Sequence, residues 1–293
     1  MALEANFCRV QLETPGFADR RLLLCTRRAR LAHGGEQVMV GDWVGLEGVD
    51  WQDGRAAIAS LEPRHSLLQR PALANADRVV VVVALAQPNL EADSLSRFLL
   101  SAEATGLEVL PVLSKADLVT AGVRQAWLQR IQTWGYGPIC VSQVDQAGIE
   151  QLRLRLDQGI SVLCGPSGVG KSSLLNALLP QLQLRTAAVS GKLQRGRHTT
   201  RHVELFPIGA NALLADTPGF NRPEIFTTSD DLASLFPEIR RRLKFGKICK
   251  FNNCMHHGEK GCAVDDNWDR YKLYISFLED ILKEQAKNKD KSK

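Results

Sequence analysis

Residues 165–172 read Gly165-Pro166-Ser167-Gly168-Val169-Gly170-Lys171-Ser172 and fit the phosphate-loop pattern G-x-x-x-x-G-K-[ST]. An apolar stretch, 160–164, precedes the loop and a leucine-rich stretch, 171–179, follows it, so we expect a strand to enter the loop and a helix to leave it. The glycines allow a tight turn whose backbone N–H groups point at phosphate oxygens, next to the positive end of the helix dipole. The sequence therefore predicts a nucleoside triphosphate site.

Within this loop two side chains have distinct predicted tasks. Lys171 is expected to reach the β- and γ-phosphates, and the Ser172 hydroxyl to bind Mg²⁺. The predicted nucleotide contacts of this segment are Gly165, Pro166, Ser167, Gly168, Val169, Gly170, Lys171, Ser172 and Ser173.

A second phosphate motif, D-x-x-G, is expected downstream. Asp216-Thr217-Pro218-Gly219 follows a predicted strand at 212–215. An aspartate at the end of a strand can hold Mg²⁺ through water, and the Gly219 N–H can contact the γ-phosphate. Alone, this tetrapeptide is also a reasonable turn; together with the phosphate loop it indicates a nucleotide hydrolase.

Between these motifs lies a Gly- and Arg-rich stretch, 196–200, which ends in two threonines. This is where a loop carrying a threonine that closes on Mg²⁺ is expected. Thr199 and Thr200 both qualify, and we prefer Thr200 as the magnesium ligand.

The predicted base-recognition motif lies upstream of the phosphate loop. Ser114-Lys115-Ala116-Asp117 follows a predicted strand at 107–113; Asp117 can accept hydrogen bonds from guanine, and Lys115 can pack beside the base. A helix cap is nearly as good an explanation of these four residues on their own, but a strand end at the crevice of the sheet favours base recognition. Ser142, after the next predicted strand, is a further candidate contact through its loop backbone.

The order of these motifs is base reader, phosphate loop, then D-x-x-G, which is a circular permutation of the usual order. It falls within a βα repeat from about residue 70 to 215, which predicts a doubly wound parallel sheet. Residues 1–68 instead predict a small closed β-barrel, with strands at 21–25, 37–40, 43–46 and 56–59. We expect domains at 1–68, 69–223 and 224–293, the last of them helical.

Three cysteines are grouped with histidines near the C-terminus as Cys249-x4-Cys254-x-His256-x5-Cys262. Three thiolates and one imidazole form a closed tetrahedral donor set, which is typical of structural zinc. On spacing alone His257 competes with His256 for the fourth position. The other four cysteines lie in apolar surroundings and are expected to be small core residues.

Composition describes an ordinary globular protein: of 293 residues, 44% are hydrophobic and 24% charged. The net charge is +5, and the cations gather at 192–201, 240–244 and 287–293, which raises the expectation of a polyanionic partner. We expect the segment at 240–250 and the predicted helix at 268–282 to form a basic surface. The N-terminus has no secretion signal and no apolar run is long enough to span a bilayer, so a cytoplasmic location, or an organelle stroma, is expected.

Together these motifs resemble the small ribosomal subunit biogenesis GTPases of bacteria and plastids, the RsgA (YjeQ) family. The resemblance rests on 40–44, 114–117, 165–172, 196–200, 216–220 and the Cys/His cluster, and covers nearly the whole chain. It implies an OB barrel, a circularly permuted GTPase domain and a zinc domain that holds one structural Zn²⁺, with His256 as the histidine ligand. It also implies GTP bound with Mg²⁺, and rRNA of the small subunit as the partner; we expect a monomer.

The resemblance further implies an activity: ribosome-stimulated hydrolysis of GTP to GDP and phosphate, late in small-subunit maturation, that drives release from the subunit. Phe220 stands where many GTPases have a glutamine that orients water, and the family's proposed substitute is here His198. The predicted catalytic residues are therefore Lys171, His198 and Thr200, although His198 could instead contact RNA. Ser114 departs from the usual asparagine, which implies a somewhat lower affinity for guanine nucleotides.

An alternative from another class is a P-loop ATPase or small-molecule kinase with a zinc module. Such a kinase needs an acceptor site and usually a lid, and the sequence offers neither. The nucleotide selectivity of Asp117→Asn separates the two hypotheses.

Overall fold

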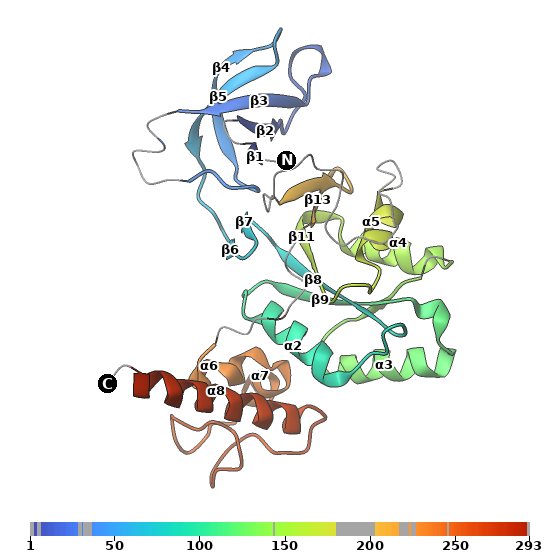
Figure 1. The fold of residues 1–293 in the computed structure, drawn as a ribbon, viewed down its shortest axis with the longest axis vertical. Coiled ribbons are helices and arrows are strands. Elements are labelled where there is room, and N and C mark those ends of the chain that lie inside the picture. Colours follow the sequence, from blue (N-terminus) through green and yellow to red (C-terminus); the bar gives the residue numbers. More distant parts are fainter. Residues whose placement is uncertain are drawn as a thin grey trace. The chain divides into compact units, whose positions relative to one another are not determined.

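The protein is described from a computed structural model (Figure 1) that divides into two compact units. One unit comprises 1–80, 150–167 and 171–221, and the other 81–149, 168–170 and 222–293. The described residues are 3–4, 7–28, 31, 37–142, 144–179, 203–216, 223, 227–244 and 246–291. No helix among them is long and apolar enough to cross a membrane.

The first unit begins with a five-stranded, OB-like sheet in the order β1-β2-β3-β5-β4. Its strands are β1 (Leu3–Glu4), β2 (Phe7–Gln11), β3 (Leu22–Arg27), β4 (Val44–Asp50) and β5 (Arg55–Leu61). Strand β2 alternates exposed and buried residues, as expected of a sheet with one face in a core. Cys8, Cys25 and Ile58 belong to that core, in agreement with the prediction that the scattered cysteines are apolar core residues. A small hairpin, β6 (Leu67–Gln69) and β7 (Ala72–Ala74), follows.

The predicted strand at 37–40 is wrong, because this segment is irregular and ends in a turn. Its backbone groups are bound by other partners: the Met39 N–H donates to the Asp42 carboxylate at 2.7 Å, and the Val40 carbonyl accepts from Ala74 N–H at 2.9 Å. Gly41 has φ +91°, and a Cβ there would lie 2.1 Å from the Ala74 carbonyl oxygen. The Gly-Asp pair thus makes a turn where hydrophobic alternation suggests a strand.

The central sheet has six strands in the order β10-β9-β8-β11-β13-β12. Its strands are β8 (Arg78–Ala84), β9 (Glu108–Ser114), β10 (Ile139–Cys140), β11 (Gln158–Cys164), β12 (Glu204–Pro207) and β13 (Asn211–Asp216). The β10–β9 and β11–β13 pairs are parallel and β12 is antiparallel to β13. Val79–Val82 are 0% exposed, as predicted for a strand covered on both faces. The sheet confirms the predicted α/β fold.

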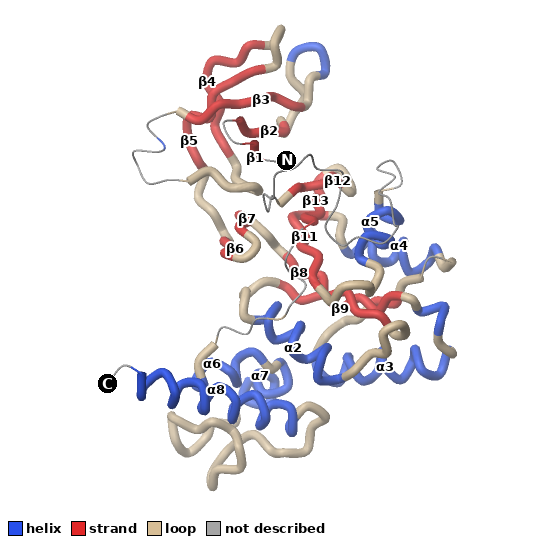
Figure 2. Tube along the Cα trace, in the orientation of Figure 1, coloured by secondary structure: helices blue, strands red, loops and turns tan. Residues whose placement is uncertain are grey.

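Helices alternate with these strands and then replace them (Figure 2). They are α2 (Ala92–Glu103), α3 (Ala121–Trp134), α4 (Gln146–Arg155), α5 (Lys171–Leu178), α6 (Ser229–Leu232), α7 (Pro237–Lys244) and α8 (Tyr271–Lys291). One apolar core in the second unit joins the C-terminal helices to Leu100 of α2 and includes the buried aromatic side chains of Phe236, Tyr274 and Phe277. Helix α7 was not predicted from the sequence. Four of its eight residues are cationic, and only Ile239 and Leu243 indicate an apolar face.

Candidate nucleotide and metal sites

The phosphate loop runs from the end of β11 to the start of α5, as the sequence predicts. Gly165, Gly168 and Gly170 have φ of +133°, +79° and +95°, a region that residues with a side chain rarely adopt. Ser167 and Gly168 at the tip are exposed, while Val169 is buried. The chain therefore has the curled backbone that a phosphate-binding loop requires.

Lys171 and Ser172 open helix α5, where both can face a ligand held by the loop. The Lys171 ammonium folds back over the loop, 2.7 Å from the Gly165 carbonyl oxygen and 2.6 Å from that of Pro166. Ser172 is exposed. A cation over the loop and an exposed hydroxyl at the helix start are the groups that bind phosphate and Mg²⁺ in P-loop proteins.

Asp216 is the last residue of β13, which lies parallel to β11. The register pairs Val162 with Ala215, so Asp216 stands level with the residue after Val162, close to where the phosphate loop begins. The chain thus brings the D-x-x-G aspartate and the phosphate loop to the same end of two neighbouring strands. Gly219, His198 and Thr200 lie outside the described residues.

The base-reading segment leaves β9 in an unusual conformation. Lys115 is left-handed, with φ 54° and ψ 38°, and Ala116–Leu118 form a 3₁₀ turn in which Asp117 is exposed. The Lys115 ammonium donates a hydrogen bond to the carbonyl oxygen of Gln87, in the loop after β8. Gln87 was not anticipated from the sequence, because a backbone carbonyl leaves no residue-type signal. The bond gives the Lys115 side chain a defined direction.

Ser114 connects the base-reading segment to the phosphate loop. Its hydroxyl is buried and lies 2.5 Å from the carbonyl oxygen of Val169, with the carbonyl oxygen of Val83 at 3.2 Å. A hydroxyl has one proton to donate, and the shorter distance assigns it to Val169. Ser114 therefore connects the two loops. At this position an asparagine usually makes such a connection.

Ser142 follows β10, the parallel neighbour of β9, at the same end of the sheet as Ser114. Its hydroxyl accepts from the Asp145 N–H at 3.0 Å and so shapes the turn into α4. The Ala116 N–H donates to the carbonyl oxygen of Val141 at 3.2 Å, which ties this loop to the base-reading segment. The Ser142 side chain thus has a structural partner, which leaves the loop backbone for any contact with a base.

Ser114→Ala is expected to weaken the binding of GTP and GDP about 10-fold, since losing the partner of a buried carbonyl costs about 1–3 kcal/mol. Preference for guanine over adenine should be retained because Asp117 is unchanged. Fluorescent-nucleotide titration measures both quantities. Ser96→Ala is the matched control, because the Ser96 hydroxyl is buried with no hydrogen-bond partner among the described residues; equal losses in the two variants would contradict the role of Ser114.

The Cys/His cluster forms a compact group of donors. The ligand atoms of Cys249, Cys254, His256 and Cys262 all lie within 4.8 Å of one another. His256 Nδ1 is 3.6, 3.7 and 3.4 Å from the Sγ atoms of the three cysteines in that order. A tetrahedron with metal–sulfur bonds of about 2.3 Å and a metal–nitrogen bond of about 2.1 Å has N···S edges of about 3.6 Å. The donors fit one tetrahedral metal ion.

Surrounding groups support this donor set. The N–H groups of Ala263 and Val264 donate to the sulfurs of Cys249 and Cys262, at 3.3 and 3.4 Å. Burial lowers the pKa of His256, so that its imidazole is neutral and able to coordinate. Burial raises the pKa of the Cys254 thiol to about 12 in the absence of a metal, so metal binding releases protons.

His257, the competing histidine, does not point into this group. It is exposed, and its Nδ1 lies 3.9 Å from a Glu259 carboxylate oxygen. The backbone decides between the two histidines, because His256 has a left-handed φ of 57° that turns its side chain inward.

The predicted basic surface at 240–250 is altered by its arginines, which make contacts within the protein. Arg240 pairs with Glu103 at 2.7 Å, Arg241 donates to the carbonyl oxygen of Thr133 at 2.5 Å, and Arg242 lies 3.4 Å from Asp265. These contacts attach α7 to α2, to the end of α3 and to the metal-binding region. The charges available to a partner are therefore mainly lysines, a point that sequence alone does not reveal.

Comparison with known proteins gives one consistent result. A sequence model of the family described as RsgA GTPase matches residues 61–226. The small ribosomal subunit biogenesis GTPase RsgA of Synechococcus sp. (strain CC9605) is 54% identical over 279 residues, which cover 95% of this chain and 91% of the relative.

Two solved structures share the fold over nearly the whole chain. The crystal structure of YjeQ from Thermotoga maritima has a TM-score of 0.77 and 28% identity, and 96% of each chain is covered. The structure of YloQ, a circularly permuted GTPase, has a TM-score of 0.78 and 29% identity, with 96% of this chain and 93% of that one covered.

Proposed function

Because this chain belongs to the RsgA GTPase family, it is a GTP hydrolase, and we propose that it acts on the small ribosomal subunit late in its maturation. In this proposal the subunit stimulates hydrolysis of GTP to GDP and phosphate, and hydrolysis drives release. The Synechococcus relative compared above is named for biogenesis of that subunit, and its match covers 95% of this chain.

The observation that carries the proposal is the hydrogen bond from Ser114 to the Val169 carbonyl oxygen. It joins a base-reading segment that precedes the phosphate loop in sequence to the loop itself. In this proposal Asp117 reads the base of the nucleotide whose phosphates the loop at 165–172 holds. An ATPase or kinase would have no use for this carboxylate, which in our proposal would accept from guanine N1 and N2.

In the phosphate part of the proposed site, some groups bind the phosphates and others stabilise the charge that develops on them. Backbone N–H groups of 165–173, other than at Pro166, which has none, hold the phosphates, and Lys171 offsets the negative charge that develops as the β–γ bridge oxygen leaves. Ser172 and Asp216, with Thr200, are the residues that would hold Mg²⁺, which supplies further charge neutralisation when bound. Gly219 would donate its N–H to the γ-phosphate.

Water attack requires a group that orients the nucleophile, and we assign this to His198. A neutral imidazole can accept from water at neutral pH, whereas Phe220 cannot. His198→Ala is expected to lower subunit-stimulated hydrolysis about 10²-fold, with GTP affinity retained. Single-turnover hydrolysis on excess small subunits measures this, and an unchanged rate would limit His198 to contacting RNA.

For the Cys₃His group we propose one structural Zn²⁺, because the donors are closed around a single position and leave no site for substrate. The residues 246–265 have few regular elements, and zinc would supply their stability. The proposed division into domains at 1–68, 69–223 and 224–293 places this group in the third.

Removing the metal with a chelator is expected to unfold residues 246–265 and to lower the melting temperature of the C-terminal helices, which share their core with Val264. GTP affinity should change less than about 3-fold, since every proposed nucleotide contact precedes residue 220. Circular dichroism melting with parallel metal analysis and nucleotide titration tests this. An unchanged melt after verified metal loss would contradict a structural role.

The proposed partners are the small subunit with its rRNA, and GTP or GDP, with the protein acting as a monomer in the cytoplasm. Hydrolysis measured with purified small subunits, with large subunits, and with none tests the function. Stimulation should occur with small subunits only and should be lost in Lys171→Ala. Equal rates in all three mixtures would refute the proposal.

A further inference from the structure

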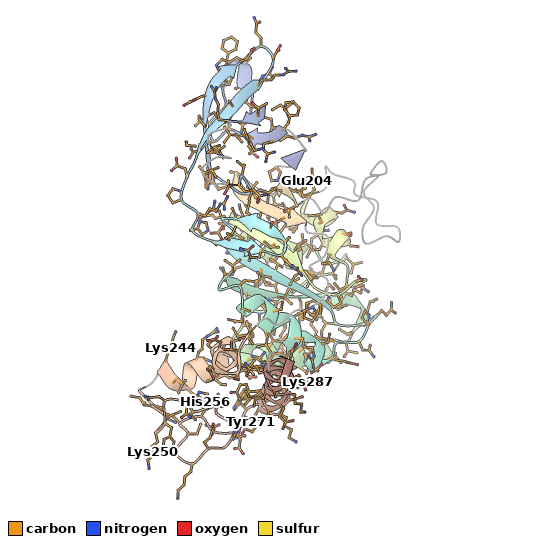
Figure 3. The ribbon with its side chains drawn as sticks, turned by 60° about the vertical axis from the view of Figure 1, so that its left-hand side comes forward. Glu204, Lys244, Lys250, His256, Tyr271 and Lys287 are labelled. Atoms are coloured by element: carbon orange, nitrogen blue, oxygen red, sulfur yellow. The ribbon has the colours of Figure 1, made fainter. Side chains whose placement is uncertain are left out.

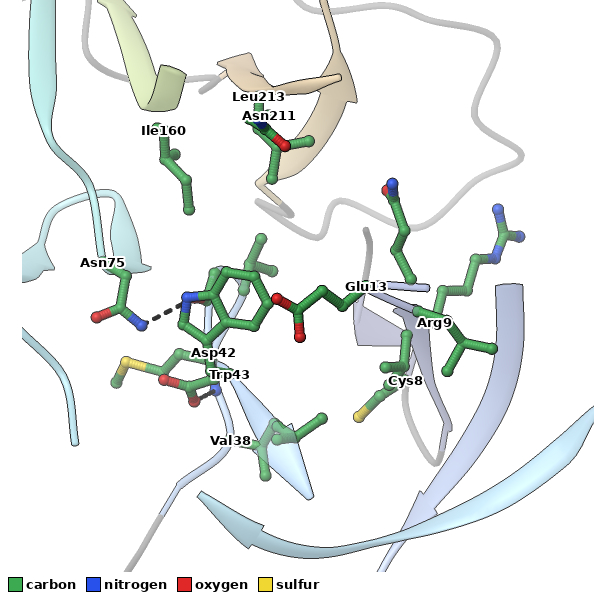
Figure 4. A pocket seen from close by; sticks show the side chains of 18 of the residues that line it. Cys8, Arg9, Glu13, Val38, Asp42, Trp43, Asn75, Ile160, Asn211 and Leu213 are labelled. Atoms are coloured by element: carbon green, nitrogen blue, oxygen red, sulfur yellow. Dashed lines mark hydrogen bonds between the residues drawn. The ribbon is translucent and has the colours of Figure 1, made fainter. Parts of the chain in front are cut away.

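The metal-binding loop exposes an unusual combination of apolar and cationic side chains, which we call the 247–251 ridge: Lys247, Ile248, Lys250 and Phe251. Ile248 is 85% exposed and Phe251 52% exposed. The Lys250 ammonium lies 5.6 Å from the centre of the Phe251 ring. Figure 3 shows Lys250 at the outer edge of the loop, whereas His256 is turned toward its interior. Two large, strongly exposed apolar side chains three residues apart in one loop favour a contact site.

The backbone of the ridge is held in place from within. Cys249, between Ile248 and Lys250, directs its sulfur into the donor group, where it also accepts from the Ala263 N–H. The Lys250 N–H donates to the Gly261 carbonyl oxygen at 2.9 Å. The ridge is therefore presented by an ordered loop, so binding would cost little conformational entropy.

The charge around the ridge is positive. Lys244, Lys247, Lys250 and Lys260 are exposed, and none has an acidic partner within the described part of the chain. The nearby acid Glu259 is occupied by the N–H groups of Met255 and His257, at 2.7 and 2.8 Å. A divalent ion with three thiolates would add a net charge of only about −1. The surface thus favours an anionic partner.

We propose that the 247–251 ridge binds an RNA segment with an accessible base: Phe251 stacks on the base, Lys247 and Lys250 contact phosphates, and Ile248 packs against a sugar. This inference rests on the proposed function and identifies the surface involved. Aromatic stacking combined with cations is how proteins hold unpaired RNA. A protein partner is disfavoured because lysine is depleted at protein interfaces.

The first test is equilibrium binding of the full chain, with a non-hydrolysable GTP analogue, to purified small subunits. Phe251→Ala should bind about 5- to 100-fold more weakly, and Phe251→Trp should bind like the unchanged protein. Leu154→Ala is the matched control, because Leu154 is 74% exposed on helix α4. Unchanged metal content and intrinsic GTP hydrolysis would show that each variant is folded. Equal binding by Phe251→Ala and the unchanged protein overturns the proposal.

The second test concerns the lysines. Lys247→Gln combined with Lys250→Gln should lower the slope of log affinity against log salt by about 1 to 2, from the loss of two phosphate contacts. Lys283→Gln is the control and should leave the slope unchanged, because Lys283 is an exposed lysine of helix α8 that pairs with Glu279 at 3.7 Å and lies outside the cation clusters. A slope equal to that of the unchanged protein excludes phosphate contacts at the ridge.

A photoreactive benzoylphenylalanine at position 251 distinguishes the two kinds of partner. Cross-links to rRNA support the proposal, and cross-links to ribosomal protein alone overturn it. If the unchanged protein fails to bind small subunits, the proposed function fails; the ridge is then tested by the same variants on short single-stranded RNA, where equal binding of Phe251→Ala refutes it.

Discussion

Asp117→Asn is expected to weaken GTP binding by about 10²- to 10⁴-fold and to transfer preference to xanthosine triphosphate. The carboxylate accepts two charge-assisted hydrogen bonds from guanine, each worth about 1.5–3 kcal/mol. An asparagine amide presents an N–H group to these guanine donors, whereas xanthine has a carbonyl that accepts it. The substitution should affect nucleotide binding without breaking a contact within the protein, because Asp117 is exposed and no described residue pairs with it.

Nucleotide titration and hydrolysis with GTP, xanthosine triphosphate and ATP measure the change. Asp93→Asn is the matched control, since Asp93 is an exposed carboxylate on α2 that pairs with Arg97 at 3.0 Å. It should leave nucleotide preference unaltered. If Asp117→Asn keeps its preference for GTP, the segment 114–117 is a helix-capping turn that does not read the base. That result would favour the ATPase or kinase alternative.

Glu238→Gln is expected to destabilise the second unit by about 3–5 kcal/mol, the cost of leaving a buried charge without its partner. Glu238 is 2% exposed and Arg270 is 0% exposed, and the two make hydrogen bonds of 2.8 and 2.6 Å. The guanidinium also lies over Trp134 and Phe236, 4.7 and 4.9 Å from the ring centres. These rings cannot replace a carboxylate, because they leave the net charge uncompensated.

Hydrogen exchange of the α7 and α8 amides, with chemical denaturation of the full chain, measures this loss. Glu279→Gln is the control, because Glu279 and Lys283 form an exposed pair and its loss should cost less than about 0.5 kcal/mol. Replacing Glu238 and Arg270 together with leucine should recover much of the stability. If Glu238→Gln loses no more stability than Glu279→Gln, the buried Glu238–Arg270 pair contributes little to the stability of the protein.

The same region connects base recognition with the metal-binding part of the chain. Helix α3 begins just after the base-reading segment and ends at Trp134, whose indole N–H donates to Asp269 at 2.8 Å. Arg130 of the same helix donates to both oxygens of Asp269, at 2.5 and 3.0 Å. This hydrogen bonding is the main cause of the lowered pKa of Asp269. Side chains near the metal site are thus fastened to the helix that follows the guanine contacts.

Much of the fold could be predicted because its signals are local or periodic. The phosphate loop needs glycines at fixed places, the buried strand β8 reads as a run of valines, and metal donors are recognised by type and spacing. Predictions failed where a backbone group forms its hydrogen bond with a partner other than a neighbouring strand of the same sheet. The segment 37–40 has the alternation of a strand, yet Asp42 and Ala74 bind its backbone groups and hold it as a turn.

For the site, the sequence by itself determined which residue types are present: the glycine-rich loop, Lys171, Asp117 and a Cys₃His donor set. Only the tertiary structure decided how they are used. It placed the Ser114 hydroxyl against Val169, chose His256 over His257 and engaged Arg240, Arg241 and Arg242 within the protein. The reason is that hydrogen bonds and ion pairs form between groups far apart in the chain, and a linear pattern holds no record of the distance between them.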